Sequence, residues 1–96
     1  MITIKLETYK DVSIFLREEK LFMHSLIVNS VKEGWKNKLD MVPVLEFHVK
    51  ENVVKIDIIR DDFKRSLLLA LEYYEVNEYY EKCMEISTLI TDMQFD

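Results

Sequence analysis

The chain has 96 residues, of which 49% are hydrophobic and 32% charged, and its formal net charge is −5. This composition predicts a single compact domain over residues 1–96 and excludes a disordered chain. No apolar run approaches the roughly 20 residues of a membrane helix, the N-terminus lacks a signal-peptide pattern, and a single cysteine excludes an internal disulfide. We therefore expect a cytoplasmic protein that does not associate with a membrane.

The first predicted elements are a strand and a long helical region. Apolar and polar residues alternate over residues 1–7, which predicts a half-buried strand. Thr8 and Asp11 then form a capping-box pattern, and apolar residues recur at three- and four-residue steps as far as Gly34, where we expect the helix to stop. The polar segment 17–20 interrupts this spacing, so residues 9–34 form either one long helix or two helices with a kink.

Residues 45–58 show the clearest β pattern of the chain. Apolar residues occupy alternate positions of segments 45–49 and 54–58. A turn at residues 51–52 pairs 49 with 54, 47 with 56 and 45 with 58, which places all six apolar residues on one face. With the N-terminal strand, this hairpin predicts a three-stranded sheet whose strand order stays open.

Residues 61–93 predict two amphipathic helices that fold back on each other at residues 76–78. Asp61 or Asp62 is expected to cap the first helix, and Asn77 to close it in the left-handed conformation. The predicted fold is therefore α+β, in the order β-α-β-β-α-α. One face of its three-stranded sheet is covered by a long helix and a C-terminal helical hairpin.

The helical hairpin carries more apolar surface than one core needs. The first helix is apolar around more than half of its circumference, and several tyrosines surround the bend. We interpret this surplus as a surface that binds a partner protein or a second copy in a homodimer, which would make the protein a small adaptor or inhibitor. Alternatively, the tyrosines pack the helix crossing. The predicted partner-binding residues are Leu68, Leu69, Tyr73, Val76, Tyr79 and Tyr80.

Acidic residues suggest an alternative function. Residues 61–96 contain three Lys or Arg and nine Asp or Glu, a net charge of −6. A ridge of carboxylates can mimic DNA phosphates and occupy the basic groove of a nucleic-acid-binding protein, with binding that salt weakens. The ridge would consist of Glu72, Glu75, Glu78, Glu81, Glu85 and Asp92. Direct nucleic-acid binding is not expected, although an exposed Trp35 beside Lys36 and Lys38 keeps it as a minor alternative.

The sequence offers no catalytic, cofactor or metal site, so we do not expect an enzyme. Gly34 is the only glycine, which excludes phosphate-binding and dinucleotide loops. His24 and His48 have no ligand-like neighbour at helical spacing. Cys83 lies on the apolar stripe of its predicted helix, so we expect a buried structural thiol.

Within residues 70–91, the bend is followed by a Tyr-Glu pair, Tyr80 and Glu81, and then by Cys83. This segment resembles the UVR-type helical hairpin of excision-repair proteins and of some Clp-associated proteins, in which Cys83 stands at one of the small positions of the motif. Ser87-Thr88 departs from the family's Arg-Asp pair. The resemblance implies a hairpin that docks on another hairpin or on a partner protein. In its composition the chain is also similar to small accessory proteins of large tailed phages.

Overall fold

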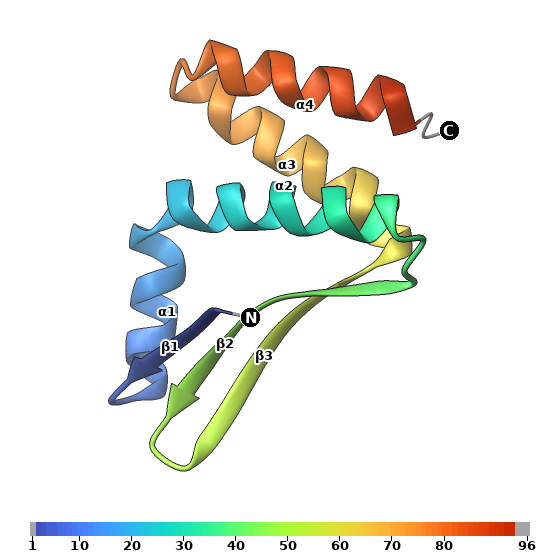
Figure 1. The fold of residues 1–96 in the computed structure, drawn as a ribbon. Helices are drawn as coiled ribbons and strands as arrows, with labels where there is room; N and C mark the ends of the chain where they lie inside the picture. Colours follow the sequence, from blue (N-terminus) through green and yellow to red (C-terminus); the bar gives the residue numbers. More distant parts are fainter. Residues whose placement is uncertain (1, 94–96) are drawn as a thin grey trace.

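A computed structural model describes residues 2–93 and confirms the α+β class, with a mixed three-stranded sheet and the predicted C-terminal helical hairpin (Figure 1). The observed order is β-α-α-β-β-α-α, since the first helical region consists of two helices. The elements are β1 (Ile2–Leu6), α1 (Tyr9–Glu18), α2 (Lys20–Lys36), β2 (Met41–Val49), β3 (Asn52–Ile59), a 3₁₀ turn (Arg60–Asp62), α3 (Phe63–Val76) and α4 (Tyr80–Met93).

The break between α1 and α2 falls inside the polar segment, as the two-helix alternative predicts. Glu19 has φ −104° and ψ 44°, which is not helical, and the two helices meet there at an elbow (Figure 1). The capping box before α1 is also confirmed. The Asp11 N–H donates to the Thr8 hydroxyl at 3.2 Å, and the Thr8 N–H donates to the Asp11 carboxylate at 3.1 Å.

The sheet has the order β1-β2-β3, with β1 parallel and β3 antiparallel to β2. The predicted register of the β-hairpin is wrong by two residues, because the loop is Lys50-Glu51 and Val49 lies opposite Asn52. Lys50 supplies the positive φ of 56° that such a tight turn needs. A shift of two residues keeps every side chain on the same face, so the predicted apolar face survives the error. A β-bulge leaves Val44 without an opposite residue. Beyond it Pro43 lies opposite Asp57, so the offset from the predicted register grows to three residues.

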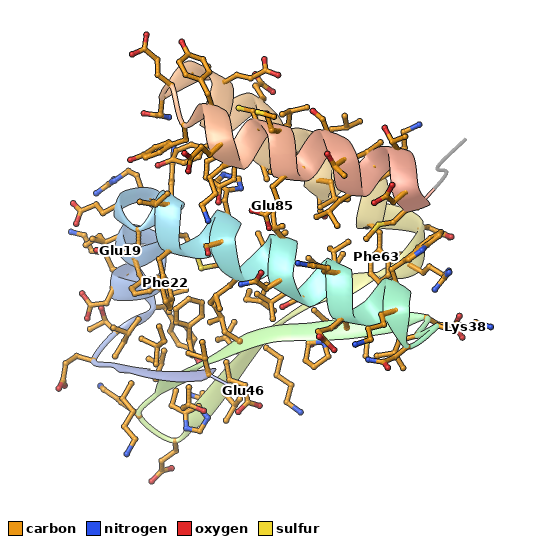
Figure 2. The ribbon with its side chains drawn as sticks, turned by 45° about the horizontal axis from the view of Figure 1, so that its top comes forward. Glu19, Phe22, Lys38, Glu46, Phe63 and Glu85 are labelled. Carbon is orange, nitrogen blue, oxygen red and sulfur yellow. The ribbon has the colours of Figure 1, made fainter. Side chains whose placement is uncertain are left out.

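Gly34 does not end its helix, which is a second correction. Helix α2 continues to Lys36, and Gly34 is buried where the Phe63 ring packs against it (Figure 2). A Cβ atom at position 34 would lie 2.8 Å from Cζ of Phe63, so glycine here permits a close approach of α3. The helix ends instead with Lys38 at φ 56° and with the Leu39 N–H donating to the Gly34 carbonyl at 2.9 Å.

The C-terminal hairpin bends within the predicted residues 76–78, but its left-handed residue is not Asn77. Asn77 has φ −96°, and Glu78 takes the left-handed conformation with φ 61°. The side chain of Asn77 donates to the Tyr73 carbonyl at 2.8 Å, and the Tyr79 N–H donates to the Tyr74 carbonyl at 2.8 Å. Asn77 therefore closes α3 through its side chain, while the backbone reverses at Glu78.

The predicted aspartate cap of α3 is also wrong. Asp62 precedes the helix but makes no capping hydrogen bond through its side chain. The chain enters α3 through the 3₁₀ turn that contains Asp61, and the Phe63 N–H donates to the Arg60 carbonyl. This local backbone bond satisfies the N–H of Phe63, one of the first N–H groups of α3 that have no partner inside the helix.

Helix α2 is the centre of the fold. It packs on β2 on one side and on α3 and α4 on the other, while α1 packs beside β1 (Figure 1). One apolar cluster joins these layers. Its members buried to at least 98% are Val31, Leu45, Phe47, Val49, Phe63, Leu67, Ala70, Tyr74 and Ile86. Among residues 2–93, no helix covers the opposite face of the sheet (Figure 1).

Candidate protein-binding groove

An apolar groove lies between the α1–α2 elbow and α3. Its volume is about 700 Å³, within the ~300–1,000 Å³ of typical small-molecule and cofactor pockets. One wall comes from the end of α1 and the first half of α2, and the other wall from the second half of α3. The groove is lined by Leu16, Lys20, Met23, His24, Ile27, Leu69, Glu72, Tyr73, Val76 and Asn77.

The structure divides the six predicted partner-binding residues into three sets. Leu69, Tyr73 and Val76 line the groove, where Leu69 is 50% and Val76 is 76% exposed. Leu68 is 45% exposed but lies outside the groove. The remaining two, Tyr79 and Tyr80, line a separate hollow at the helical bend together with Glu78, Glu81 and Lys82.

Two of the residues that line the groove, His24 and Tyr73, belong to a cluster of aromatic rings. The His24 ring stacks on Tyr73 with a centroid distance of 4.6 Å, and the Tyr74 ring meets both of them edge-on. Tyr79 contacts Tyr74 in turn, at 5.9 Å. The alternative in which tyrosines pack the helix crossing therefore describes Tyr74, which is buried, whereas Tyr80 is 65% exposed.

His24 is the least satisfied polar group of this region. Its Nδ1 atom is buried and has no hydrogen-bond partner among residues 2–93. Burial lowers the pKa of His24 below its usual 6.5, and the nearby charge of Lys20 lowers it further. Burial also raises the pKa of Tyr74 above 10.0, and the carboxylate of Glu85 adds to this effect. The neutral imidazole is thus the form that the groove favours.

The α1–α2 wall of the groove was not predicted as part of a site. The three- and four-residue steps that include Leu16, Met23 and Ile27 predict one helix or two, and do not mark these residues as a binding surface. The sequence does contain a signal, because positions 16, 20, 23 and 27 are spaced by four, three and four residues. Their role depends on the elbow at Glu19, which turns the end of α1 toward α3, and spacing alone does not determine that direction.

The six predicted acidic residues are all exposed but do not share one surface feature. Glu72 lines the apolar groove, whereas Glu81 and Glu85 line a shallow hollow on α4. Glu85 also lies on the side of α4 that faces α2, close to Ser25 and Asn29 (Figure 2). The remaining acidic residues of the predicted ridge, Glu75, Glu78 and Asp92, are exposed on α3, at the bend and on α4.

The prediction of an exposed Trp35 is wrong. Trp35 is half-buried, and the guanidinium of Arg60 lies 4.4 Å from its ring centroid in a cation–π contact. Arg60 also donates from Nη1 to the Leu39 carbonyl at 3.1 Å, which fixes the guanidinium in place. This arrangement removes the free aromatic face that base stacking would require.

The remaining reactive residues are dispersed. Cys83 is a free thiol that is half-buried rather than fully buried. His48 lies 3.3 Å from Glu46 on the open face of the sheet. Within residues 2–93 no group of three His, Cys, Asp or Glu side chains is arranged to hold a metal ion. None of the helices in this range is long and apolar enough to cross a membrane.

Comparison with known proteins provides no family for this chain, since no family model, curated protein or solved structure matches it. The helical hairpin that the UVR-type resemblance implied is present, as α3 and α4. The identity of that hairpin with the UVR family stays a hypothesis.

Proposed function

We propose that this protein is a non-catalytic adaptor or inhibitor that binds an amphipathic helix of a partner protein in the groove between the α1–α2 elbow and α3. The observation that carries the proposal is the groove itself, with exposed Leu16, Leu69 and Val76 on its two walls. Grooves between helices commonly receive a partner helix through apolar residues at positions i, i+3 or i+4, and i+7.

The charged residues of the groove specify the chemistry of the partner. Lys20 and Glu72 come from opposite walls, so a bound helix fits best with a carboxylate near Lys20 and a basic residue near Glu72. The neutral His24–Tyr73 stack offers a flat aromatic surface for an aliphatic side chain at the centre. The UVR-type resemblance, which implies docking between helical hairpins, agrees with a helical partner.

Two adjacent leucines provide a matched test. Leu69→Lys places a charge in the groove, while Leu68→Lys places the same charge at a position of similar exposure outside it. Tagged wild-type protein and both variants would be used for affinity capture from the cells that make the protein, in low salt and in 0.5 M salt. We expect one protein that wild type and Leu68→Lys retain in both salts and that Leu69→Lys loses. Equal retention by the two variants contradicts the proposal.

The acidic decoy remains the alternative proposal, and the same capture separates it from groove binding. Exposed carboxylates such as Glu75 and Glu81 would retain a basic partner at low salt only, because 0.5 M salt screens charges over a few ångströms. The dispersed positions of Glu72 and Glu85 favour the groove over a single acidic ridge.

A further inference from the structure

Strand β3 forms a free edge of the sheet. The strand order β1-β2-β3 leaves β3 with a hydrogen-bonded neighbour on one side only, next to β2 (Figure 1). Its eight residues include neither proline nor glycine, and the bulge of this hairpin lies on β2. At about 3.4 Å per residue, the edge is roughly 27 Å long. Alternate residues of such an edge direct unpaired N–H and C=O groups outward and can accept another strand.

The charges of β3 are complementary to those of a second, antiparallel β3. If Ile56 lies opposite Ile56 of a second copy, Lys55 of each copy lies opposite Asp57 of the other. Both charged side chains are exposed on the face of the sheet that carries no helix. Neither residue forms an ion pair within residues 2–93. Opposite charges placed directly across a strand pair stabilise it.

The apolar residues of β3 match in the same register. Val53 lies opposite Ile59 of the second copy on the helix-free face, where both residues are about half exposed in the single chain. Val54 lies opposite Ile58 on the face that α2 covers, where both already contact the core. Every position from 53 to 59 thus meets a residue of matching polarity.

Other registers lose this match. A shift of two residues in either direction places Lys55 opposite Lys55 or Asp57 opposite Asp57. A shift of one residue sets the helix-covered face of one strand against the helix-free face of the other. The complementarity therefore selects one two-fold arrangement, centred on Ile56.

We propose that the protein forms a homodimer in which two β3 strands pair antiparallel about this two-fold axis and join the sheets into one of six strands. The helical layers of both copies then lie on the same face of the joined sheet. The proposal goes beyond the groove: it concerns a different surface, and it stands whether or not a partner helix binds there.

A charge swap tests both the dimer and its register. Sedimentation equilibrium would give the dimer dissociation constant of wild type, Lys55→Asp, Asp57→Lys and the double variant. Each single change places a residue at position 55 opposite a residue of the same charge at position 57 of the other copy, and the two-fold axis repeats this contact. We therefore expect the dissociation constant of the dimer to rise about tenfold or more. The double variant restores opposite charges and should recover an affinity near that of wild type. Because both side chains are exposed, all variants should fold, which thermal unfolding checks.

Three outcomes overturn the proposal: a wild-type protein that stays monomeric at all concentrations, single variants that dimerise as wild type does, or a double variant that fails to recover. A monomeric wild type would mean that Lys55 protects the edge from pairing, as edge lysines do in many sheets. Val76→Lys, at the far end of the groove, should lose the partner and keep the dimer, so failure of the proposed function and failure of this dimer are distinguishable.

Discussion

Replacing Gly34 by alanine should destabilise the protein, against the usual preference of helices for alanine. In the interior of α2 the change would add about 1 kcal/mol of stability by propensity alone. The new Cβ atom, however, would lie 2.8 Å from Cζ of Phe63 and 3.2 Å from Cβ of Val42. Phe63 is fully buried, so its ring has no solvent to move into, and overpacking of this kind costs about 1–3 kcal/mol. We expect a net loss of about 1 kcal/mol.

A double-mutant cycle measures this effect. Urea and thermal unfolding of Gly34→Ala should show the loss, with a decrease in Tm of about 4–8 °C for a domain of this size. Phe63→Leu removes the atom that the new Cβ contacts, so Gly34→Ala in that background should be neutral or stabilising. The reasoning is refuted if Gly34→Ala stabilises the wild-type protein, or if it costs the same in both backgrounds.

Two further variants test the local structure. Thr8→Ala removes the capping box of α1 and should cost about 1 kcal/mol in urea unfolding, whereas Thr88→Ala on the exposed face of α4 should stay within about 0.5 kcal/mol of wild type. Lowering the pH from 7.5 to 5 should destabilise the protein in part through His24. The pKa of His24 is lowered in the folded state, so the unfolded state binds the proton more tightly. The folded protein therefore has its full stability above pH 6.5, the usual pKa of histidine, and loses part of it as the pH falls toward the pKa of His24 in the folded state. His24→Phe should show a smaller loss over this range, and an unchanged loss would contradict the role of His24.

Residue patterns were sufficient to predict the helices and strands, but not the register of the β-hairpin, its bulge or the contact between Gly34 and Phe63. Alternation predicted the strands because a half-buried sheet requires it, and it could not separate two registers that differ by two residues and share the same faces. Pro43 beside Val44 becomes a sign of the bulge only once the strand order is known, because proline inside a central strand is confined to bulges. Gly34 was interpreted as a helix stop because its actual function, to admit the Phe63 ring, depends on a contact between distant segments.

The apolar residues that form one wall of the groove were predicted from the sequence, but the groove itself was not. The periodicity of α3 identified Leu69, Tyr73 and Val76 as surplus to the core, and these residues form one wall. The other wall depends on the angle that α1 and α2 form at the elbow at Glu19, and spacing along the chain does not give that angle. Leu68 and Tyr80 were grouped with the wall residues because they share their apolar character, although they lie outside the groove.

Site-specific photo-crosslinking tests the proposed groove most directly. A benzophenone amino acid would replace Val76 in the groove and, in a matched variant, Tyr80 outside it, since the two positions are 76% and 65% exposed. If a partner helix occupies the groove, irradiation in the producing cells should cross-link that partner from position 76 and not from position 80. Cross-links from position 80 alone would place the docking surface at the bend of the helical hairpin and contradict the groove.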